Sequence, residues 1–548
     1  MNRIQFIFPI LLIFVSSCNS PKMKVDLLVT NALVYTVNDS FAIAESFAVQ
    51  DGKFVAVGTN EEVAAKYVSD EIIDCGGKPV YPGFIDAHSH FYGYGMNLMQ
   101  YADLAGLVDQ ESIYKKLQDH RLKAGGEWLL GRGWDQNLWP EKEFPDNRRL
   151  DELFPDVPVY LIRIDGHAAW CNSKAMEMAG ITSSTQIDGG EVLLKKGKPT
   201  GVLIDNAKEL VSKWIPEPGV ALKTKALLAA QQNCFEVGLT SVTDCGLPKE
   251  IILLMDSLQK KGELKMQINA MMDPSAENIR HFLKNGPYRT GRLQVNTIKL
   301  YADGALGSRG AYLLEDYSDD PGNRGLLMNG PEYFESICRK AYDAGFQVAT
   351  HCIGDGANRF ILTVYGKFLQ GKNDHRWRIE HAQIVSQEEL SLFGKYSVIP
   401  SVQATHATSD MFWADERLGA ERLKSAYALQ QLLEQNGWLP NGTDFPIESI
   451  KPMLTFFASV CRKNTDGLPA EGFQMENALT REQALRSITI WAAKAGFEEL
   501  KKGSIEAGKS ADFVVLDTDL MNCCDEEILH AKLMKTVLGG EVVYELKP

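Results

Sequence analysis

Cysteine is scarce in this chain of 548 residues: there are ten, and no two have the Cys-x-x-Cys spacing of a zinc knuckle or a dithiol redox site. Their scattered positions also exclude a disulfide-dense fold, so we expect most of them to be small, buried, apolar side chains. Positive charge is scarce as well, because the chain has 57 Lys and Arg residues but 71 Asp and Glu residues, which gives a formal net charge of -14. Since no Lys/Arg-rich run offsets this balance, it argues against nucleic-acid binding and favours small-molecule partners.

Long apolar runs are confined to the start of the chain. Asn2 and Arg3 form a short basic region, and residues 4–15 form an apolar stretch too short to span a bilayer as a mature helix. The following Ser16-Ser17-Cys18 resembles the lipobox of bacterial lipoproteins. We therefore predict a lipoprotein signal peptide over residues 1–17 and a lipidated Cys18, which would anchor the protein in the bacterial cell envelope, facing the periplasm or the exterior. A plain signal peptide with an incidental cysteine is the alternative.

Short alternating stretches separated by Gly or Asn turns occur near both ends of the chain. The predicted strands are 24–30, 32–36, 44–50 and 54–57 near one end, and 512–516, 533–538 and 541–544 near the other. Such a pattern favours antiparallel pairing. Neither end is long enough for a sandwich of its own, so we predict one small β-sandwich domain built from residues 18–80 and 501–548.

Between these ends, in residues 81–500, predicted strands alternate with helix-compatible runs, which indicates a parallel sheet. The candidate strands are 84–85, 239–243, 265–271, 297–301, 347–349, 377–379, 398–402 and 439–441. Eight strands close a (β/α)8 barrel of the TIM type, an α/β fold whose active site lies at the carboxyl ends of the strands. The interval at about 91–238 is too long for one connection, so we predict a long insertion after the first barrel strand, acting as a lid or specificity domain.

Residues that commonly bind metals stand at the predicted strand ends. His88 and His90 follow the first strand, and residues two apart in an extended chain point the same way, so both imidazoles can reach one ion. The later strands supply His351, His381 and Asp444 as further candidate ligands, and also Lys299, which is the odd member because lysine is rarely buried and its ammonium would repel a metal ion. Imidazole and carboxylate donors suit a borderline-soft divalent metal, with zinc as the first choice. Each residue alone is a weak signal, but their shared position at strand ends predicts a metal centre.

Together these residues resemble the metal centre of the amidohydrolase superfamily. Gly-Trp-Asp at 133–135, Asp-Gly-His at 165–167 and the run Lys-Leu-Tyr-Ala-Asp-Gly-Ala-Leu-Gly-Ser-Arg at 299–309 are similar to the branch that contains N-substituted formamide deformylases. The resemblance implies one or two divalent ions, the first held by His88, His90 and Asp444 and the second by His351 and His381. It also implies that Lys299 is N-carboxylated and bridges the two ions. An ion pair of Lys299 with Asp303 or Glu380 is the alternative.

The predicted chemistry is hydrolysis of a C-N bond in an amide, formamide or cyclic amide by a metal-activated water. Asp444 is the candidate that carries a proton from the water to the leaving nitrogen. His406, after the seventh strand, and His167, in the insertion, are candidate oxyanion stabilisers or substrate contacts, and a structural histidine is the alternative for each. Weaker candidates for substrate contact are Arg132, Trp134, Asp135 and Arg309, of which Trp134 could instead pack the lid.

Two other functions stay open at this point. The same centre could hydrolyse esters or other C-O bonds, or the chain could be a non-catalytic, surface solute-binding lipoprotein that kept the barrel. Asp444 discriminates between catalysis and binding, because a pure binder needs no carboxylate beside the metal. We expect a small-molecule substrate, no nucleic acid, membrane contact through the lipid anchor alone, and a homodimer as the assembly to test.

Overall fold

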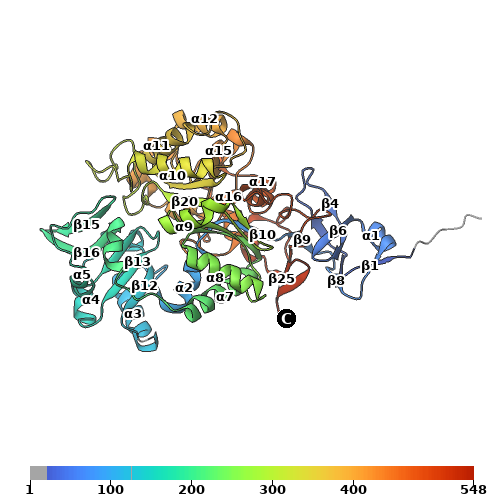
Figure 1. Cartoon of the computed structure of the whole chain (residues 1–548), viewed down its shortest axis with the longest axis horizontal. Coiled ribbons are helices and arrows are strands. Elements are labelled where there is room, and N and C mark those ends of the chain that lie inside the picture. The colour runs from blue at the N-terminus through green and yellow to red at the C-terminus, as the bar shows by residue number, and fades with distance from the viewer. Residues whose placement is uncertain (1–20, 125, 548) are drawn as a thin grey trace, which may run out of the picture.

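The computed structural model describes residues 21–124 and 126–547, so Cys18 and the predicted signal peptide lie outside the described residues. Its centre is a parallel barrel, flanked on one side by a sheet inserted after the first strand and on the other by sheets near the two ends of the described chain (Figure 1). Among the described residues, no helix has both the length and the apolar character needed to cross a membrane. The described cysteines form no disulfide, and all but Cys523 and Cys524 are buried.

The predicted parallel α/β barrel is confirmed in outline. Its strands pair in the order β10-β17-β18-β20-β21-β22-β23, and every neighbouring pair is parallel. Their bounds are β10 Phe84–Ser89, β17 Leu239–Leu247, β18 Gln267–Met272, β20 Leu293–Tyr301, β21 Gln347–Cys352, β22 Arg378–His381 and β23 Ile399–Ser401. The short strand β19 (Tyr288–Arg289) pairs antiparallel with β20 outside this path.

The predicted eighth strand, at 439–441, is wrong as a strand, although the segment lies where it was expected. Asn441 forms only an isolated parallel bridge with Val402. Beyond it, Gly442 N donates to Val402 O at 3.0 Å and Asp444 N donates to His88 O at 2.8 Å, so the segment still joins both edges of the barrel. Pro440 has no N-H to donate to a ladder, and Asp444 has a left-handed φ of 60° that ends the extended conformation. The barrel is therefore nearly closed.

Amphipathic helices cover the outside of the barrel. In α10 (Pro331–Asp343), Phe334, Ile337, Cys338 and Ala341 are buried, and their spacing of three and four residues places them on one face. A proline in the first turn suits the helix start, where no N-H partner is required. The other helices that alternate with the strands are α8 Lys249–Lys260, α9 Ala276–Phe282, α11 Asp355–Gly366, α12 Gln387–Tyr396, α15 Leu429–Asn436 and α16 Pro452–Cys461.

The insertion spans fewer residues than the predicted interval of about 91–238. Helices α2 (Phe91–Gln100) and α7 (Val220–Glu236) bracket the insertion, pack against each other and contact β17, so they belong to the barrel. Between them, strands pair in the order β11-β12-β13-β14-β16-β15. Their bounds are β11 Ala102–Asp103, β12 Leu129–Trp134, β13 Val159–Arg163, β14 Ala168–Cys171, β15 Gly190–Lys195 and β16 Lys198–Asp205. This sheet carries its own apolar core, which includes Trp134, Trp139 and Trp170.

The two ends of the described chain share one sheet, and a second sheet lies near the first end. One sheet has the order β26-β25-β24-β9-β3-β4 and therefore mixes both ends, whereas the other, β6-β5-β2-β8, comes from the first of them. The bounds are β2 Leu27–Thr30, β3 Leu33–Tyr35, β4 Ile43–Ala44, β5 Ser46–Gln50, β6 Lys53–Gly58, β8 Ile72–Asp74, β9 Pro79–Pro82, β24 Phe513–Leu516, β25 Leu533–Leu538 and β26 Glu541–Glu545. The expected antiparallel pairing is confirmed for most neighbouring strands of these two sheets, but β2 pairs with β8, and β3 with β9, in parallel. Both pairs join strands separated by several other elements, and such connections permit parallel pairing.

Candidate active site

The candidate metal ligands meet at the carboxyl ends of the barrel strands. His88 lies in β10, and His90 directly follows this strand. Ligand atoms of His88, His381 and Asp444 all lie within 4.8 Å of one another. Nε2 of His88 and Nε2 of His90 lie 3.4 Å and 3.2 Å from Asp444 Oδ1. The structure therefore brings the His-x-His pair and Asp444 to one point, although 354 residues separate His90 from Asp444 in the sequence.

The remaining candidate ligands adjoin this group. The ring of His351 lies 4.5 Å from that of His381, measured between centroids, and its Nε2 lies 3.3 Å from the Gly304 carbonyl oxygen. Lys299 is fully buried, and its Nζ lies 3.3 Å from His88 Nε2. Among the described residues, no carboxylate oxygen of Asp303 or Glu380 lies within ion-pair distance of Lys299 Nζ, so the alternative partners are not in place.

These residues fit a divalent cation. His381 Nδ1 and Asp444 Oδ1 are buried and have no hydrogen-bond partner in the described part of the chain. Burying a polar atom without a partner is costly, and such atoms in a folded protein call for an explanation. A cation would satisfy both atoms, and imidazole with carboxylate is a donor set that zinc and similar metals accept.

A buried carboxylate orients His88. Glu380 Oε2 accepts a hydrogen bond from His88 Nδ1, which leaves Nε2 with a free lone pair directed at the centre. Arg378 Nε lies 3.3 Å from the other Glu380 oxygen. Burial raises the pKa of Glu380, but Arg378 and His88 outweigh burial and hold that pKa well below its usual range. Glu380 is therefore an anionic partner of a candidate ligand, the arrangement that fixes the tautomer of many metal-binding histidines.

We expect Glu380→Gln to weaken metal binding about 10- to 100-fold, because the amide cannot accept from His88 with the strength of a carboxylate. Competition with a chelator, followed by elemental analysis, measures the affinity. Glu388→Gln is the matched control, since Glu388 is exposed on α12 and pairs with Arg359. An affinity that stays the same in Glu380→Gln and in the control would remove this role from Glu380.

A second buried carboxylate joins the His-x-His strand to the loop that carries Asp444. Asp86 accepts from His88 N at 3.1 Å and from the Thr443 hydroxyl at 2.7 Å. Between these contacts, Gly442 passes so close to β10 that a Cβ there would lie 2.5 Å from His88 N. The close approach requires glycine, and it sets the position of Asp444 beside His88.

His406 holds the other oxygen of Asp444. Its Nε2 lies 3.3 Å from Asp444 Oδ2, and its Nδ1 lies 3.2 Å from Glu448 Oε1. Burial lowers the pKa of His406, but the hydrogen bonds to the two carboxylates outweigh burial and raise it to about 10. Glu448 also accepts from Ser409 Oγ at 2.6 Å. His406 therefore fixes Asp444 through Oδ2 and leaves Oδ1 facing the histidines.

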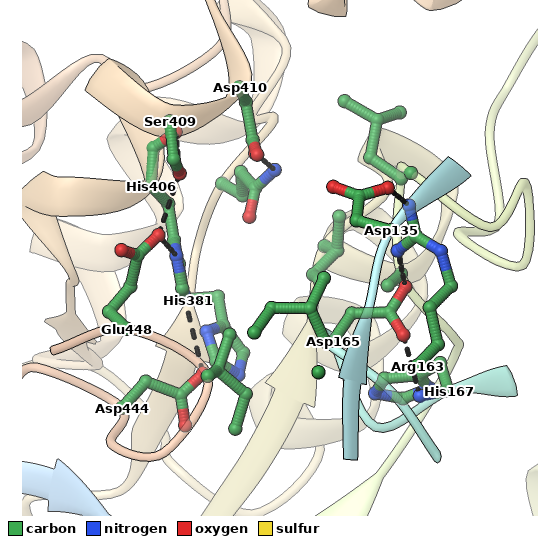
Figure 2. Close-up of a pocket in the computed structure, with 18 of the residues that line it drawn as sticks. Asp135, Arg163, Asp165, His167, His381, His406, Ser409, Asp410, Asp444 and Glu448 are labelled. Carbon is green, nitrogen blue, oxygen red and sulfur yellow. Dashed lines mark hydrogen bonds and ion pairs between the residues drawn. The ribbon is translucent and has the colours of Figure 1, made fainter. Parts of the chain in front are cut away.

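A cavity of about 280 Å³ lies between the barrel and the insertion, and the insertion forms the wall opposite the residues of the barrel (Figure 2). Arg163 pairs there with Asp135 and Asp165. His167 Nδ1 lies 2.7 Å from Asp205 Oδ1, and the His167 ring lies 4.9 Å from that of His351 between centroids. Opposite them, the barrel presents His406, Asp410, Asp444 and Glu448. A small molecule in this cavity would touch both the candidate metal centre and the inserted domain.

Two of the predicted substrate contacts, Trp134 and Arg309, do not line the central cavity. Trp134 is fully buried and its Nε1 donates to Leu161 O at 2.8 Å, so it packs the core of the insertion. Arg309 pairs with Asp319 at 2.8 Å and borders a different cavity. Asp135 does line the central cavity, although its carboxylate is engaged by Arg163, and Arg132 lines a neighbouring cavity.

Several residues of the site escaped the sequence analysis. Asp86, Asp205, Asp410 and Glu448 have no strand-end or motif signal that marks them as partners of the histidines. The sequence suggests Glu380 only as an alternative ion-pair partner of Lys299. Glu380 directly precedes His381, and Asp86 stands two residues before His88; this proximity in the sequence is the one signal that could have found them.

A barrel with histidines and a carboxylate gathered at its strand ends defines a metal-dependent hydrolase. Comparison with known protein families supports this class. The chain belongs to the amidohydrolase family, whose sequence model matches residues 71–544. It is 33% identical to Protein LONG AFTER FAR-RED 3 of Arabidopsis thaliana, covering 95% of this chain and 91% of the relative. It is 26% identical to N-substituted formamide deformylase of Arthrobacter pascens, covering 95% and 98%. A crystal structure of an uncharacterized metal-dependent hydrolase from Pyrococcus horikoshii OT3 matches with a TM-score of 0.73 at 28% identity, covering 91% of this chain and 99% of that one.

Proposed function

We propose that this protein hydrolyses a C-N bond of a small amide, formamide or cyclic amide. The observation that carries the proposal is the geometry of Asp444, which His406 holds through Oδ2 while Oδ1, buried and without a hydrogen-bond partner among the described residues, faces His88 and His90. The similarity to an N-substituted formamide deformylase supports a C-N bond.

The residues that would hold metal, with zinc as our first choice, are His88, His90, Lys299, His351, His381 and Asp444. Such an ion lowers the pKa of a coordinated water towards neutrality and polarises a carbonyl. Asp444 Oδ1 would accept the proton of the attacking water and return it to the leaving nitrogen. His167, held by Asp205, and His406 lie on opposite walls of the cavity, where each ring can orient the substrate.

A panel of substrates tests the proposal directly. Zinc-loaded protein is assayed with amides, N-substituted formamides and cyclic amides, and with the ester matched to each amide. We expect turnover of members of the C-N panel that a chelator abolishes and added zinc restores. Turnover of esters alone would assign the centre to C-O bonds, and bound zinc with no turnover of either panel would make the protein a binder.

A further inference from the structure

A second cavity, of about 670 Å³, adjoins the candidate metal centre. It shares His90, Asp165, His167 and Ile447 with the central cavity. Tyr301, which also borders it, lies 5.7 Å from His351 between ring centroids and has Lys299 Nζ 4.9 Å from its ring centre. A substrate whose scissile bond sits among the histidines can therefore extend into this second cavity.

Two cationic side chains converge on one point of its wall. Lys208 Nζ donates to the Gly166 carbonyl. A Cβ built on Gly166 would lie 3.5 Å and 3.7 Å from the two Nη atoms of Arg132, so Arg132 lies against the same glycine. Gly166 has a φ of 76°, and the turn it makes exposes its backbone to both side chains. The Asp-Gly-His motif thus places two positive charges together at the edge of the cavity.

Neither cation has an ion-pair partner in the described part of the chain. Arg132 donates to the Ile164 carbonyl at 3.3 Å, and within the described ranges its Nε is buried without a hydrogen-bond partner. Asp165 and Asp205 lie near these cations and attract them, but their direct contacts are with other side chains, because Asp165 pairs with Arg163 and Asp205 with His167.

The other two carboxylates that line this cavity, Glu209 and Glu217, form no ion pair with Arg132 or Lys208 within the described residues. Glu209 and Glu217 are exposed at the rim, and Glu217 lies 3.6 Å from Lys223. Burial lowers the pKa of both Arg132 and Lys208, a penalty that a bound anion would relieve.

We propose that this second cavity binds a carboxylate carried by the substrate, with Arg132 and Lys208 as its partners. The inference rests on the proposed function and narrows it, because the substrate becomes a small amide whose far end is anionic. Tyr92, Tyr101, Tyr160 and Tyr301 line the same cavity and offer apolar ring faces to the part of the substrate between the amide and the carboxylate. An arginine is well suited to the task, because its planar guanidinium can hold both carboxylate oxygens.

Paired substrates test this subsite. The zinc-loaded enzyme is assayed with N-formylated ω-amino acids of increasing chain length, each compared with the N-formyl alkylamine of the same length. We expect the wild type to favour the carboxylate at one chain length, and Arg132→Gln to reduce that preference at least about tenfold, as loss of a charge-assisted hydrogen bond would. Lys208→Gln should reduce it in the same direction and serves if Arg132→Gln fails to fold. Lys174→Gln, an exposed cation elsewhere on the insertion, should leave the preference unchanged.

A binding measurement separates failure of this inference from failure of the proposed function. Calorimetry compares phenylacetate with phenylethanol on the same zinc-loaded variants. Preferential binding of phenylacetate that is lost in Arg132→Gln or Lys208→Gln supports the subsite even if no amide is hydrolysed, in which case the proposed function alone is overturned. Equal binding of the two probes by the wild type, together with no carboxylate preference among hydrolysed amides, overturns the subsite and leaves the proposed hydrolysis intact.

Discussion

Asp444→Asn should keep most of its bound metal and lose turnover, with kcat falling by about 10²- to 10⁴-fold. The amide oxygen of asparagine can still face His88 and His90, where Asp444 Oδ1 lies 3.4 Å and 3.2 Å from their Nε2 atoms. It cannot take up the proton of the attacking water, so the step that depends on a base at this position fails. Single-turnover kinetics and elemental analysis on the same preparation measure the two quantities.

Glu448→Gln provides the matched comparison. Glu448 is the second carboxylate on His406, with Oε1 3.2 Å from its Nδ1, but it does not touch His88 or His90. Glu448→Gln weakens the hydrogen bonding that orients His406 but keeps the carboxylate of Asp444. We therefore expect kcat to fall clearly less in Glu448→Gln than in Asp444→Asn. A near-normal kcat in Asp444→Asn would take Asp444 out of the mechanism, and equal losses in both variants would indicate that support of His406, not proton transfer, is the shared cause.

The barrel and its strand-end ligands could be predicted because their signals are local. An apolar run that ends in His, Asp or Lys is visible within a few residues, and parallel strands in a barrel must place their carboxyl ends together. The same reasoning failed for residues 439–441, where Pro440 interrupts the ladder and Gly442 lies against β10. A count of strands could not anticipate that close approach.

The partners of the ligands could not be predicted, because they depend on contacts between distant segments. His88 meets Glu380 across 292 residues, and His167 meets Asp205 across 38. His381, Asp444 and Asp205 also have left-handed φ values of 74°, 60° and 47°. Residues other than glycine pay an energetic penalty in this region, and such strain often accompanies a functional site. No feature of the sequence marks these three positions for that conformation.

Lys299→Ala should lose both bound metal and activity if Lys299 is the carboxylated bridge. The side chain is fully buried and its Nζ lies 3.3 Å from His88 Nε2. Burial lowers the pKa of Lys299, but neighbouring groups that include Cys245, Tyr301 and Glu380 outweigh burial, and the net direction is upward. Carboxylation requires the neutral amine, which the positive charge of a bound cation would favour, so carboxylation would be coupled to metal loading. Adding formate or acetate should restore part of the metal content of Lys299→Ala by filling the vacated position.

Lys299→Arg separates the bridge from a simple buried cation. The guanidinium of arginine keeps its positive charge and cannot be carboxylated. If a carboxylated Lys299 bridges the ions, Lys299→Arg should therefore lose metal as well. A purely electrostatic role predicts that arginine retains the metal. Lys502→Ala is the matched control. Lys502 is also a buried lysine, but its Nζ donates a hydrogen bond to Ser241 Oγ at 2.8 Å near the start of β17, away from the candidate ligands. Its replacement should lower the stability of the fold without changing the metal content. Elemental analysis of the three variants, with and without added formate, decides the matter: full metal occupancy in Lys299→Arg would exclude the carboxylated bridge.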